Sequence, residues 1–158
     1  MSDGLALLVA LVLSAFFSGM EIAYLSANRL QIEIETKRST LMGRWLTYLI
    51  AHPGHYIGAM LMGNTLALVV VGLKTASLLD PWLLAYMSTG WAVTLETLGS
   101  TIVVLFAAEY LPKAFFRHRA NDSLRWFTVP LMLVYMVLWP LVEILTRLSR
   151  LFLRRMGR

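Results

Sequence analysis

The sequence contains no cysteine. Disulfide bridges, a thiol nucleophile, iron–sulfur clusters and cysteine-ligated zinc sites are therefore excluded, and cysteine usage indicates no redox compartment. Charged residues are also scarce, because they make up 15% of the 158 residues against about 25% in a typical soluble domain. Apolar residues account for 58% of the chain. This excess favours a lipid bilayer as the surrounding solvent.

Motifs of the common enzyme classes are missing as well. The chain has no HExxH pair, no GxSxG elbow and no phosphate-binding loop, so we expect a protein that is not an enzyme. An intramembrane acid–base enzyme built on Glu21 and Glu109 would lack a nucleophile or an activated water. His52 and His55 have an i, i+3 spacing, but the Pro-Gly pair between them predicts an interfacial loop rather than a metal site.

Three apolar segments are long enough to cross a bilayer, which takes about 20 helical residues. They cover about residues 5–26, 56–79 and 88–111, and the second is expected to end at Asp80-Pro81. No basic residue precedes the first segment, so it is predicted to be a retained transmembrane helix and not a signal peptide. The sequence thus predicts an all-α membrane protein with three transmembrane helices in a single domain, 1–158.

Basic residues cluster in two segments that we expect to lie on the cytoplasmic side. The first, about 28–50, is partly amphipathic, which is typical of a helix along the membrane surface. The second, about 121–156, follows the basic sequence FFRHR and ends in the basic tail TRLSRLFLRRMGR. By the positive-inside rule, the N-terminus is outside and the C-terminus is cytoplasmic.

The last apolar stretch, 126–145, has basic clusters at both ends, which requires an even number of membrane crossings. We therefore predict a bent helical hairpin along or dipping into the inner leaflet, bent at Pro130 or Pro140. A fourth transmembrane helix is the alternative. The basic tail is expected to contact anionic lipid or lead into a following domain, and no nucleic-acid partner is expected.

Several oxygen-bearing side chains fall inside the predicted spans, where an ionisable group costs about 2.5–3.5 kcal/mol and usually faces a functional interior. At about 1.5 Å per helical residue, Ser18, Glu21, Asn64 and Glu109 all fall in the cytoplasmic halves of their helices. Neighbouring glycines permit close backbone approach or an irregular helix that frees carbonyl oxygens. Such hard donors suit Mg²⁺, Ca²⁺ or Na⁺ rather than zinc or copper.

Each of these residues also has a structural interpretation. Ser18 and Asn64 can form interhelical hydrogen bonds, and glycines of the second span can serve as packing surfaces. Glu109 can form a helix-end salt bridge with Lys113, four residues on. Glu96 lies about 20 Å from Glu109 along the third span, so one site cannot hold both, and Glu96 is expected to face an outer vestibule.

Three motifs, in order along the chain, resemble the CorC/cyclin M (CNNM) family of magnesium transporters. The sequence FFSGMEIAYLSANRLQIE resembles the first-helix signature of that family, which reads like FFSGSEMALLSLNR. The sequence HPGHYIGAMLMGNTLA resembles its second-helix segment, and AAEYLPKAFF resembles the GE-x-x-PK motif that ends its third helix. The resemblance covers essentially the whole chain as a transmembrane domain.

The resemblance implies a homodimer of three-helix protomers with a juxtamembrane belt on the cytoplasmic side of the cell membrane. It also implies that a largely dehydrated Mg²⁺ ion is held in a central cavity, and that its export is coupled to Na⁺ entry. Family members carry cytoplasmic nucleotide-sensing CBS domains. These 158 residues hold none, so we expect a transmembrane domain that ends in a linker.

The motifs also transfer candidate site residues by position. The Mg²⁺ site residues are Ser18, Gly19, Glu21, Gly63, Asn64 and Glu109. Secondary or Na⁺-site candidates are Ser26, Asn28, Glu96, Gly99 and Ser100, and structural roles are expected for Pro112 and Lys113. The departures from the family pattern are Ala108 for the glycine of GE-x-x-PK, Met20 for a serine, and Gly63-Asn64 for a longer polar run.

The leading hypothesis is a Mg²⁺ transporter domain that works by alternating access. The alternatives are a passive cation channel, a Mg²⁺ sensor that moves no ion, and a membrane anchor for cytoplasmic domains. Flux and binding measurements separate them, because a sensor binds Mg²⁺ without flux, a channel conducts independently of a Na⁺ gradient, and an anchor binds no Mg²⁺.

Overall fold

The computed structural model describes residues 2–36 and 41–156, and within these ranges the chain is helical with no β-strand. The prediction of an all-α protein is confirmed. The elements in chain order are α1 (Asp3–Ser26), α2 (Arg29–Thr36), α3 (Leu41–Ala51), α4 (Pro53–Tyr86), α5 (Thr89–Val103), the π-helix η1 (Val104–Tyr110), α6 (Leu111–His118), α7 (Ala120–Trp126) and α8 (Thr128–Met156).

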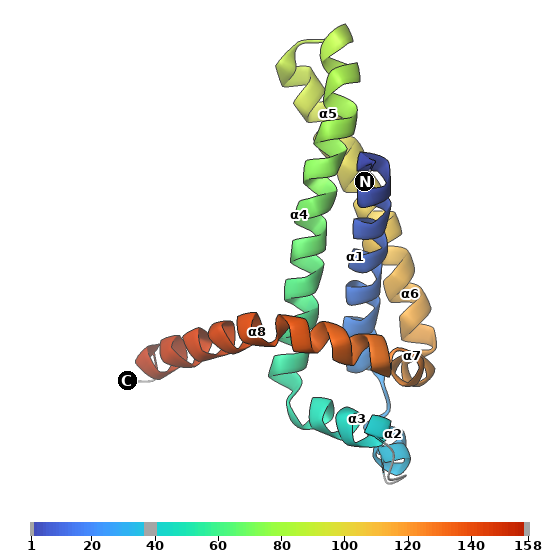
Figure 1. The fold of residues 1–158 in the computed structure, drawn as a ribbon, viewed down its shortest axis with the longest axis vertical. Coiled ribbons are helices and arrows are strands. Elements are labelled where there is room, and N and C mark those ends of the chain that lie inside the picture. The colour runs from blue at the N-terminus through green and yellow to red at the C-terminus, as the bar shows by residue number, and fades with distance from the viewer. Residues whose placement is uncertain (1, 37–40, 157–158) are drawn as a thin grey trace.

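Three helical rods lie side by side and form a bundle (Figure 1). They are α1, α4, and the continuous rod of α5, η1 and α6. Helix α1 contacts α4 as well as η1 and α6, so it lies between the other two rods over most of its length. Many apolar side chains on the outside of the bundle are exposed, among them Val12, Val69 and Ile102. This is the surface of a bundle whose surroundings are apolar.

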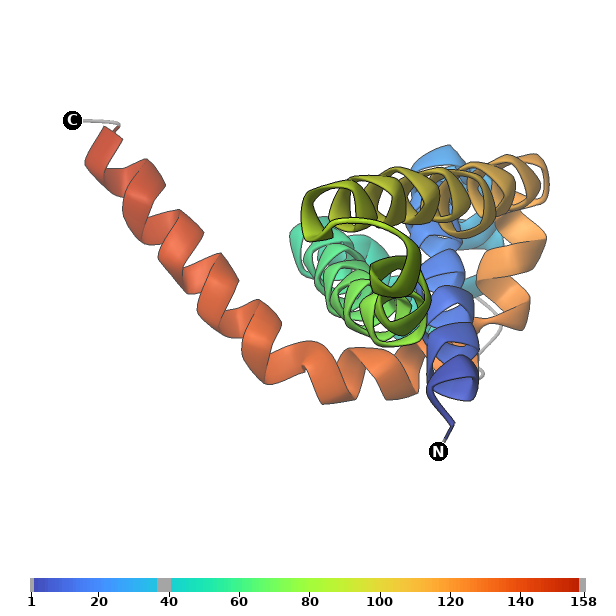
Figure 2. The same ribbon diagram turned by 90° about the horizontal axis from the view of Figure 1, so that it is seen from above.

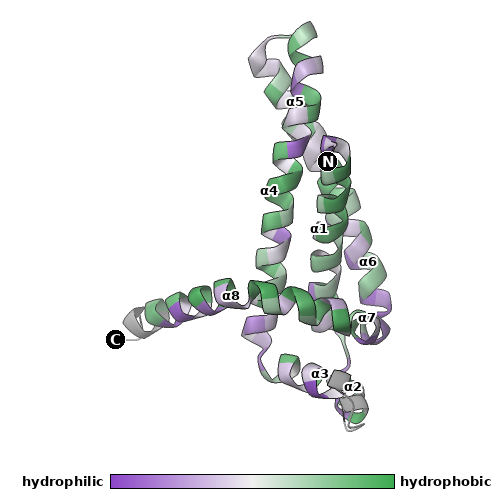
Figure 3. Ribbon diagram, in the orientation of Figure 1, coloured by the Kyte–Doolittle hydropathy of each residue, from purple (hydrophilic) through white to green (hydrophobic). Residues whose placement is uncertain are grey.

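The two ends of the bundle differ. At one end α4 turns into α5, and we call this the distal end (Figure 1). At the other end α2, α3, α7 and α8 gather around the bundle, and we call this the belt end. Hydrophilic residues are concentrated at the belt end, whereas the rods are mostly apolar along their length (Figure 3). The polar juxtamembrane segment predicted at about 28–50 corresponds to α2 and α3.

Helix α4 is longer at both ends than the predicted span 56–79. The prediction that it ends at Asp80-Pro81 is wrong, because the helix continues to Tyr86. Pro81 removes one backbone hydrogen bond, and its exposed position near the end of the helix makes that loss tolerable. The loop predicted around His52 and His55 is also wrong, because Pro53 begins α4 at a position where the missing N–H would have no partner anyway.

Helix α8 lies across the bundle rather than along it (Figures 1 and 2). Its segment Thr128–Phe152 is the fourth one that is long and apolar enough to cross a membrane, after α1, α4 and the third rod. The predicted hairpin is wrong, since α8 is one helix that changes direction part-way (Figure 2). Pro140 in its interior accounts for a bend without a reversal, and Pro130 lies in its first turn, where proline is tolerated.

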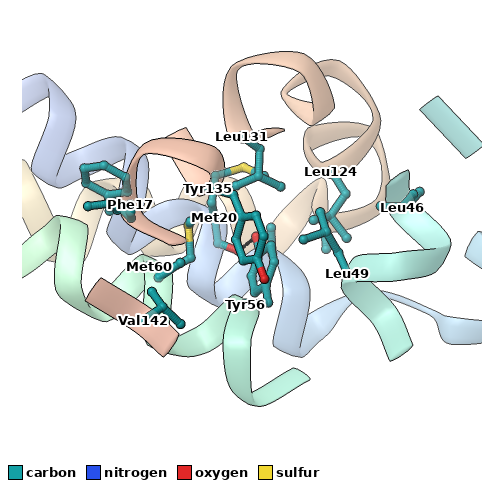
Figure 4. Packing of buried hydrophobic residues seen from close by; sticks show 14 of the residues in the cluster. Phe17, Met20, Leu46, Leu49, Tyr56, Met60, Leu124, Leu131, Tyr135 and Val142 are labelled. Carbon is teal, nitrogen blue, oxygen red and sulfur yellow. Dashed lines mark hydrogen bonds between the residues drawn. The ribbon is translucent and has the colours of Figure 1, made fainter. Parts of the chain in front are cut away.

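The hydrophobic core lies at the belt end, where α8 crosses α1 and α4 (Figure 4). Met20, Tyr56 and Met60 are fully buried there, together with Leu131 of α8. The Tyr56 hydroxyl donates a hydrogen bond of 2.9 Å to the carbonyl oxygen of Met20, and its ring stacks on Tyr24 at 4.2 Å. Tyr56 therefore joins α1 to the first turn of α4.

Tyr56→Phe is expected to destabilise the bundle by about 1 kcal/mol, because it removes a buried hydrogen bond while keeping the ring. The measurement is thermal unfolding in detergent. Tyr86→Phe is the matched control, since Tyr86 is 82% exposed at the distal end of the same helix. Equal unfolding temperatures for the two variants would show that the Tyr56 hydroxyl does not stabilise the contact.

Candidate cation site

Two glycines allow α1 to approach both of its neighbours closely. A Cβ at Gly63 of α4 would lie 2.6 Å from the ring of Phe17, and a Cβ at Gly19 of α1 would lie 2.6 Å from the ring of Phe116 in α6. Phe116 is itself held by Phe127, with ring centroids 5.6 Å apart. Both glycines thus provide space for an aromatic ring of the neighbouring rod.

Close approach brings a polar contact into the bundle. The Ser14 hydroxyl of α1 donates a hydrogen bond of 2.6 Å to Oδ1 of Asn64 in α4. Ser14 is fully buried, and Asn64 is half-buried. Asn64 was expected from the sequence, both as a ligand and as an interhelical hydrogen-bonding residue, but Ser14 was not. The sequence feature that could have identified Ser14 is its position four residues before Ser18, which places the two serines on one face of α1.

Ser18 has a buried hydroxyl without a partner. The side chain is 0% exposed, and its Oγ makes no hydrogen bond within the part of the chain that the structure describes. A serine in a helix can bond back to the preceding turn, but Ser18 does not. A buried polar atom left in this way costs about 1–3 kcal/mol, so an unpaired hydroxyl calls for a ligand or another explanation.

Glu109 lies in the π-helix η1. This segment packs against α1, and Glu109 is half-buried in it, next to the fully buried Ala108. Single π turns within longer helices are frequent at functional sites. The irregular helix expected beside Gly19 and Gly63 is therefore found at Glu109 instead. Helices α1 and α4 remain regular through both glycines, because these serve close packing.

No salt bridge joins Glu109 to Lys113 among the described residues. Glu109 belongs to η1, which ends at Tyr110, whereas Lys113 belongs to α6, so these two side chains do not lie on one regular i, i+4 helix face. Pro112 lies in the first turn of α6, where proline is tolerated, and Lys113 is half-buried beside it. The Glu109 carboxylate is thus not neutralised by its neighbour.

The register of the helices gives the relative depth of these groups. Helix α1 and the third rod run in the same direction (Figure 1), and Gly19 faces Phe116. Glu109 precedes Phe116 by seven residues, so it lies about 10 Å toward the distal end, which is close to the level of Ser14. Ser14, Asn64 and Glu109 therefore share a level, with Ser18 about one turn closer to the belt.

Glu21 lies closer to the belt than the other candidates. It follows Gly19 by two residues, which places it about 13 Å from the level of Glu109 along the bundle. Glu21 is half-buried and forms no hydrogen bond or ion pair with the described residues. The two carboxylates expected at similar depth are consequently separated, with Glu21 on the belt side of the other candidates.

The secondary candidates fall in two places. Asn28 has a structural role at the belt end, because its Oδ1 accepts a hydrogen bond from the N–H of Leu30, and its own N–H donates to Asn121 of α7. Ser26 is exposed at the last residue of α1. The others lie on α5 in the distal half, namely Glu96, Gly99 and Ser100.

A cavity of about 340 Å³ separates the serine level from the distal end. Residues of α1, α4 and the third rod line it, including Thr75, Gly99 and Ser100. Nearby, the Lys74 ammonium and the Ser77 hydroxyl of α4 donate hydrogen bonds of 2.6 and 2.8 Å to the two carboxylate oxygens of Asp3. We call these three residues the distal clamp, since they join the start of α1 to α4.

The chemistry of the site is that of mixed oxygen donors. Among the described residues there is no group of three or more His, Asp or Glu side chains that could hold a metal ion. The candidate oxygen donors at about the level of Ser14 are instead the Ser14 hydroxyl, the Asn64 amide and the single carboxylate of Glu109. Such ligands suit hard cations.

Together, the apolar rods and the oxygen donors between them define a helical membrane domain. Comparison with known proteins identifies its family. The chain belongs to the cyclin M (CNNM) family, because the family model described as the cyclin M transmembrane N-terminal domain matches residues 5–158. The resemblance seen in the three motifs is thereby confirmed. The chain is also 29% identical, over 155 residues, to the inner membrane protein YfjD of Escherichia coli. That match covers 92% of this chain and 33% of the relative, so the chain spans about a third of that protein.

Gly63→Ala is expected to lower the stability of the domain by about 1–3 kcal/mol, as overpacking does, because the new methyl group would overlap the Phe17 ring. Thermal unfolding in detergent measures the loss. Gly72→Ala on the same helix is the control, since nothing lies within 4 Å of a Cβ at Gly72. If both variants unfold like the parent, the close approach of α1 and α4 does not depend on Gly63.

Proposed function

We propose that this chain is the transmembrane domain of a Mg²⁺ transporter that exports Mg²⁺ in exchange for Na⁺ by alternating access. The observation that carries the proposal is the buried hydroxyl of Ser18, which has no partner among the described residues and lies on the same face of α1 as the Ser14–Asn64 hydrogen bond. Membership of the cyclin M family, a transporter family rather than an enzyme family, supports it.

Mg²⁺ gives up its water reluctantly, so a site that strips part of its shell needs several oxygen donors and a negative charge close by. In the proposed site, Ser18 contributes its hydroxyl and Asn64 its amide oxygen. Glu109 contributes the charge from η1, the segment that packs against α1. Because one carboxylate offsets only half of the ion's charge, binding stays weak enough for release.

Glu21 has a different role in this proposal. Its carboxylate lies on the belt side of the site and has no cationic partner among the described residues. A fixed negative charge near a site in low-dielectric surroundings raises the local concentration of cations. We therefore assign Glu21 to attracting Mg²⁺ to the site rather than to direct ligation.

The belt end is proposed to face the cytoplasm. Lys113, Arg117, Arg119 and Arg125 all lie near this end of the third rod or in α7, as the positive-inside rule requires of a cytoplasmic surface. The N-terminus and the distal clamp then face outward. In this proposal the distal clamp closes the outer end of the bundle, and the outward state would require Asp3 to separate from Lys74. Gly99 and Ser100, in the cavity between, are the candidates for Na⁺.

We also propose two partners. Helix α8 extends well beyond the bundle (Figures 1 and 2) and exposes apolar side chains such as Leu148 and Leu151, which fits a second copy of the chain packed against it in a homodimer. The relative is about three times as long as the matched region, which fits cytoplasmic CBS domains in the full-length protein.

Asn64→Ala and Ser18→Ala are each expected to reduce Mg²⁺ flux into or out of proteoliposomes at least tenfold, because each removes one of few oxygen donors. Thr65→Ala is the control, since the Thr65 hydroxyl donates within its own helix to Leu61. Unchanged flux in both variants would contradict the proposed site. Mg²⁺ binding without any flux would instead identify a sensor, and flux that is independent of a Na⁺ gradient would identify a channel.

Asp3→Asn is expected to open the distal end, because it weakens the bond that Lys74 and Ser77 make to α1. The chain has no cysteine, so a single Thr75→Cys reports on the cavity behind the clamp. A membrane-impermeant maleimide should label this cysteine several times faster in the Asp3→Asn background. Ser88→Cys, exposed between α4 and α5, should be labelled equally in both backgrounds. Equal labelling of Thr75→Cys in the parent and Asp3→Asn backgrounds would mean that the distal clamp does not close the cavity that Thr75 lines.

A further inference from the structure

Ser14 lies outside the FFSG motif and bears no role in the site as derived from that motif. It nevertheless contacts Asn64 closely, with 2.6 Å between Ser14 Oγ and Asn64 Oδ1. Its side chain is 0% exposed, so this contact is shielded from solvent. One turn further along the same face of α1 lies the hydroxyl of Ser18, for which the described part of the chain provides no partner.

An asparagine amide is ambiguous as a metal ligand. Its oxygen binds a cation, whereas its NH₂ group is a donor of nearly the same shape that repels one. Rotation about the last side-chain bond exchanges the two. In this bundle the hydrogen bond from Ser14 holds the oxygen of Asn64 against α1, on the side where Ser18 lies. The oxygen has a second lone pair, which this bond leaves free.

We propose that Ser14 is a positioning residue for the Mg²⁺ site, which holds the Asn64 amide with Oδ1 turned toward the cation and toward Ser18. This inference rests on the proposed function. Ser14 acts through Asn64 and is not itself a ligand. In this structure Ser14 donates to Oδ1, so the amide oxygen already faces α1 and Mg²⁺ does not have to reorient the side chain on binding.

Removal of such an outer partner typically weakens metal binding 10–100-fold. Mg²⁺ is titrated by calorimetry against the purified chain in detergent, and thermal unfolding without Mg²⁺ reports on the fold of each variant. Ser14→Ala is expected to raise the Kd for Mg²⁺ at least tenfold. Ser14→Cys keeps the volume of the side chain but is a weak donor, so it should raise the Kd as well. Thr65→Ala should bind like the parent.

A double-mutant cycle distinguishes positioning from ligation or simple packing. In an Asn64→Asp background either carboxylate oxygen can face the ion, so orientation no longer matters. Ser14→Ala should then change the Kd by less than about threefold. If Ser14→Ala still raises the Kd for Mg²⁺ tenfold in the Asn64→Asp background, the positioning role is wrong. A direct ligand or a packing residue would be needed whichever side chain stands at position 64.

The remaining outcomes separate this inference from the function on which it rests. If Asn64→Ala weakens Mg²⁺ binding but Ser14→Ala and Ser14→Cys bind like the parent, the positioning role is wrong and the proposed function stands. If the parent chain binds no Mg²⁺, or Asn64→Ala binds as tightly as the parent, the proposed site fails and the role of Ser14 fails with it.

Discussion

The close approach of α1 to both neighbouring rods is the constraint on which the rest of the structure depends. The absence of a side chain at Gly63 leaves room for the Phe17 ring, and its absence at Gly19 leaves room for the Phe116 ring. Only because these contacts are so close does the short side chain of Ser14 reach Asn64 across the helix interface. A bulkier residue at Gly63 would separate the helices, break that hydrogen bond and widen the space in which a cation could be held by protein oxygens.

The surrounding bilayer explains where the protein places its core and its polar groups. Apolar side chains on the rods gain little from contacting one another when lipid is equally apolar, so tight packing and buried hydrogen bonds hold the rods together. Among the described residues, a conventional hydrophobic core forms at the belt end, where α8 crosses α1 and α4 and Tyr56 joins two helices. The buried Ser14–Asn64 hydrogen bond is such a contact between α1 and α4.

Much of this fold could be predicted from the sequence, because length and apolar composition are properties of single segments. The three rods and the surface helices α2 and α3 follow from them. The predicted end of α4 at Asp80-Pro81 is wrong, because a proline in the exposed last turns of a helix destabilises it little. The sequence does not show which positions are exposed. The hairpin was also wrong, because Pro140 can bend a helix or end it, and only the packing of α8 across the bundle decides between these.

The sequence by itself determined the chemistry available to this protein: hard oxygen donors in apolar helices, no thiol, and the motifs of the cyclin M family. It also determined which residues lie on one face of one helix. Tertiary structure alone decided which faces meet, because register between helices depends on side chains far apart in the chain. That register pairs Ser14 with Asn64, leaves the Ser18 hydroxyl unpartnered among the described residues, and separates Glu21 from Glu109.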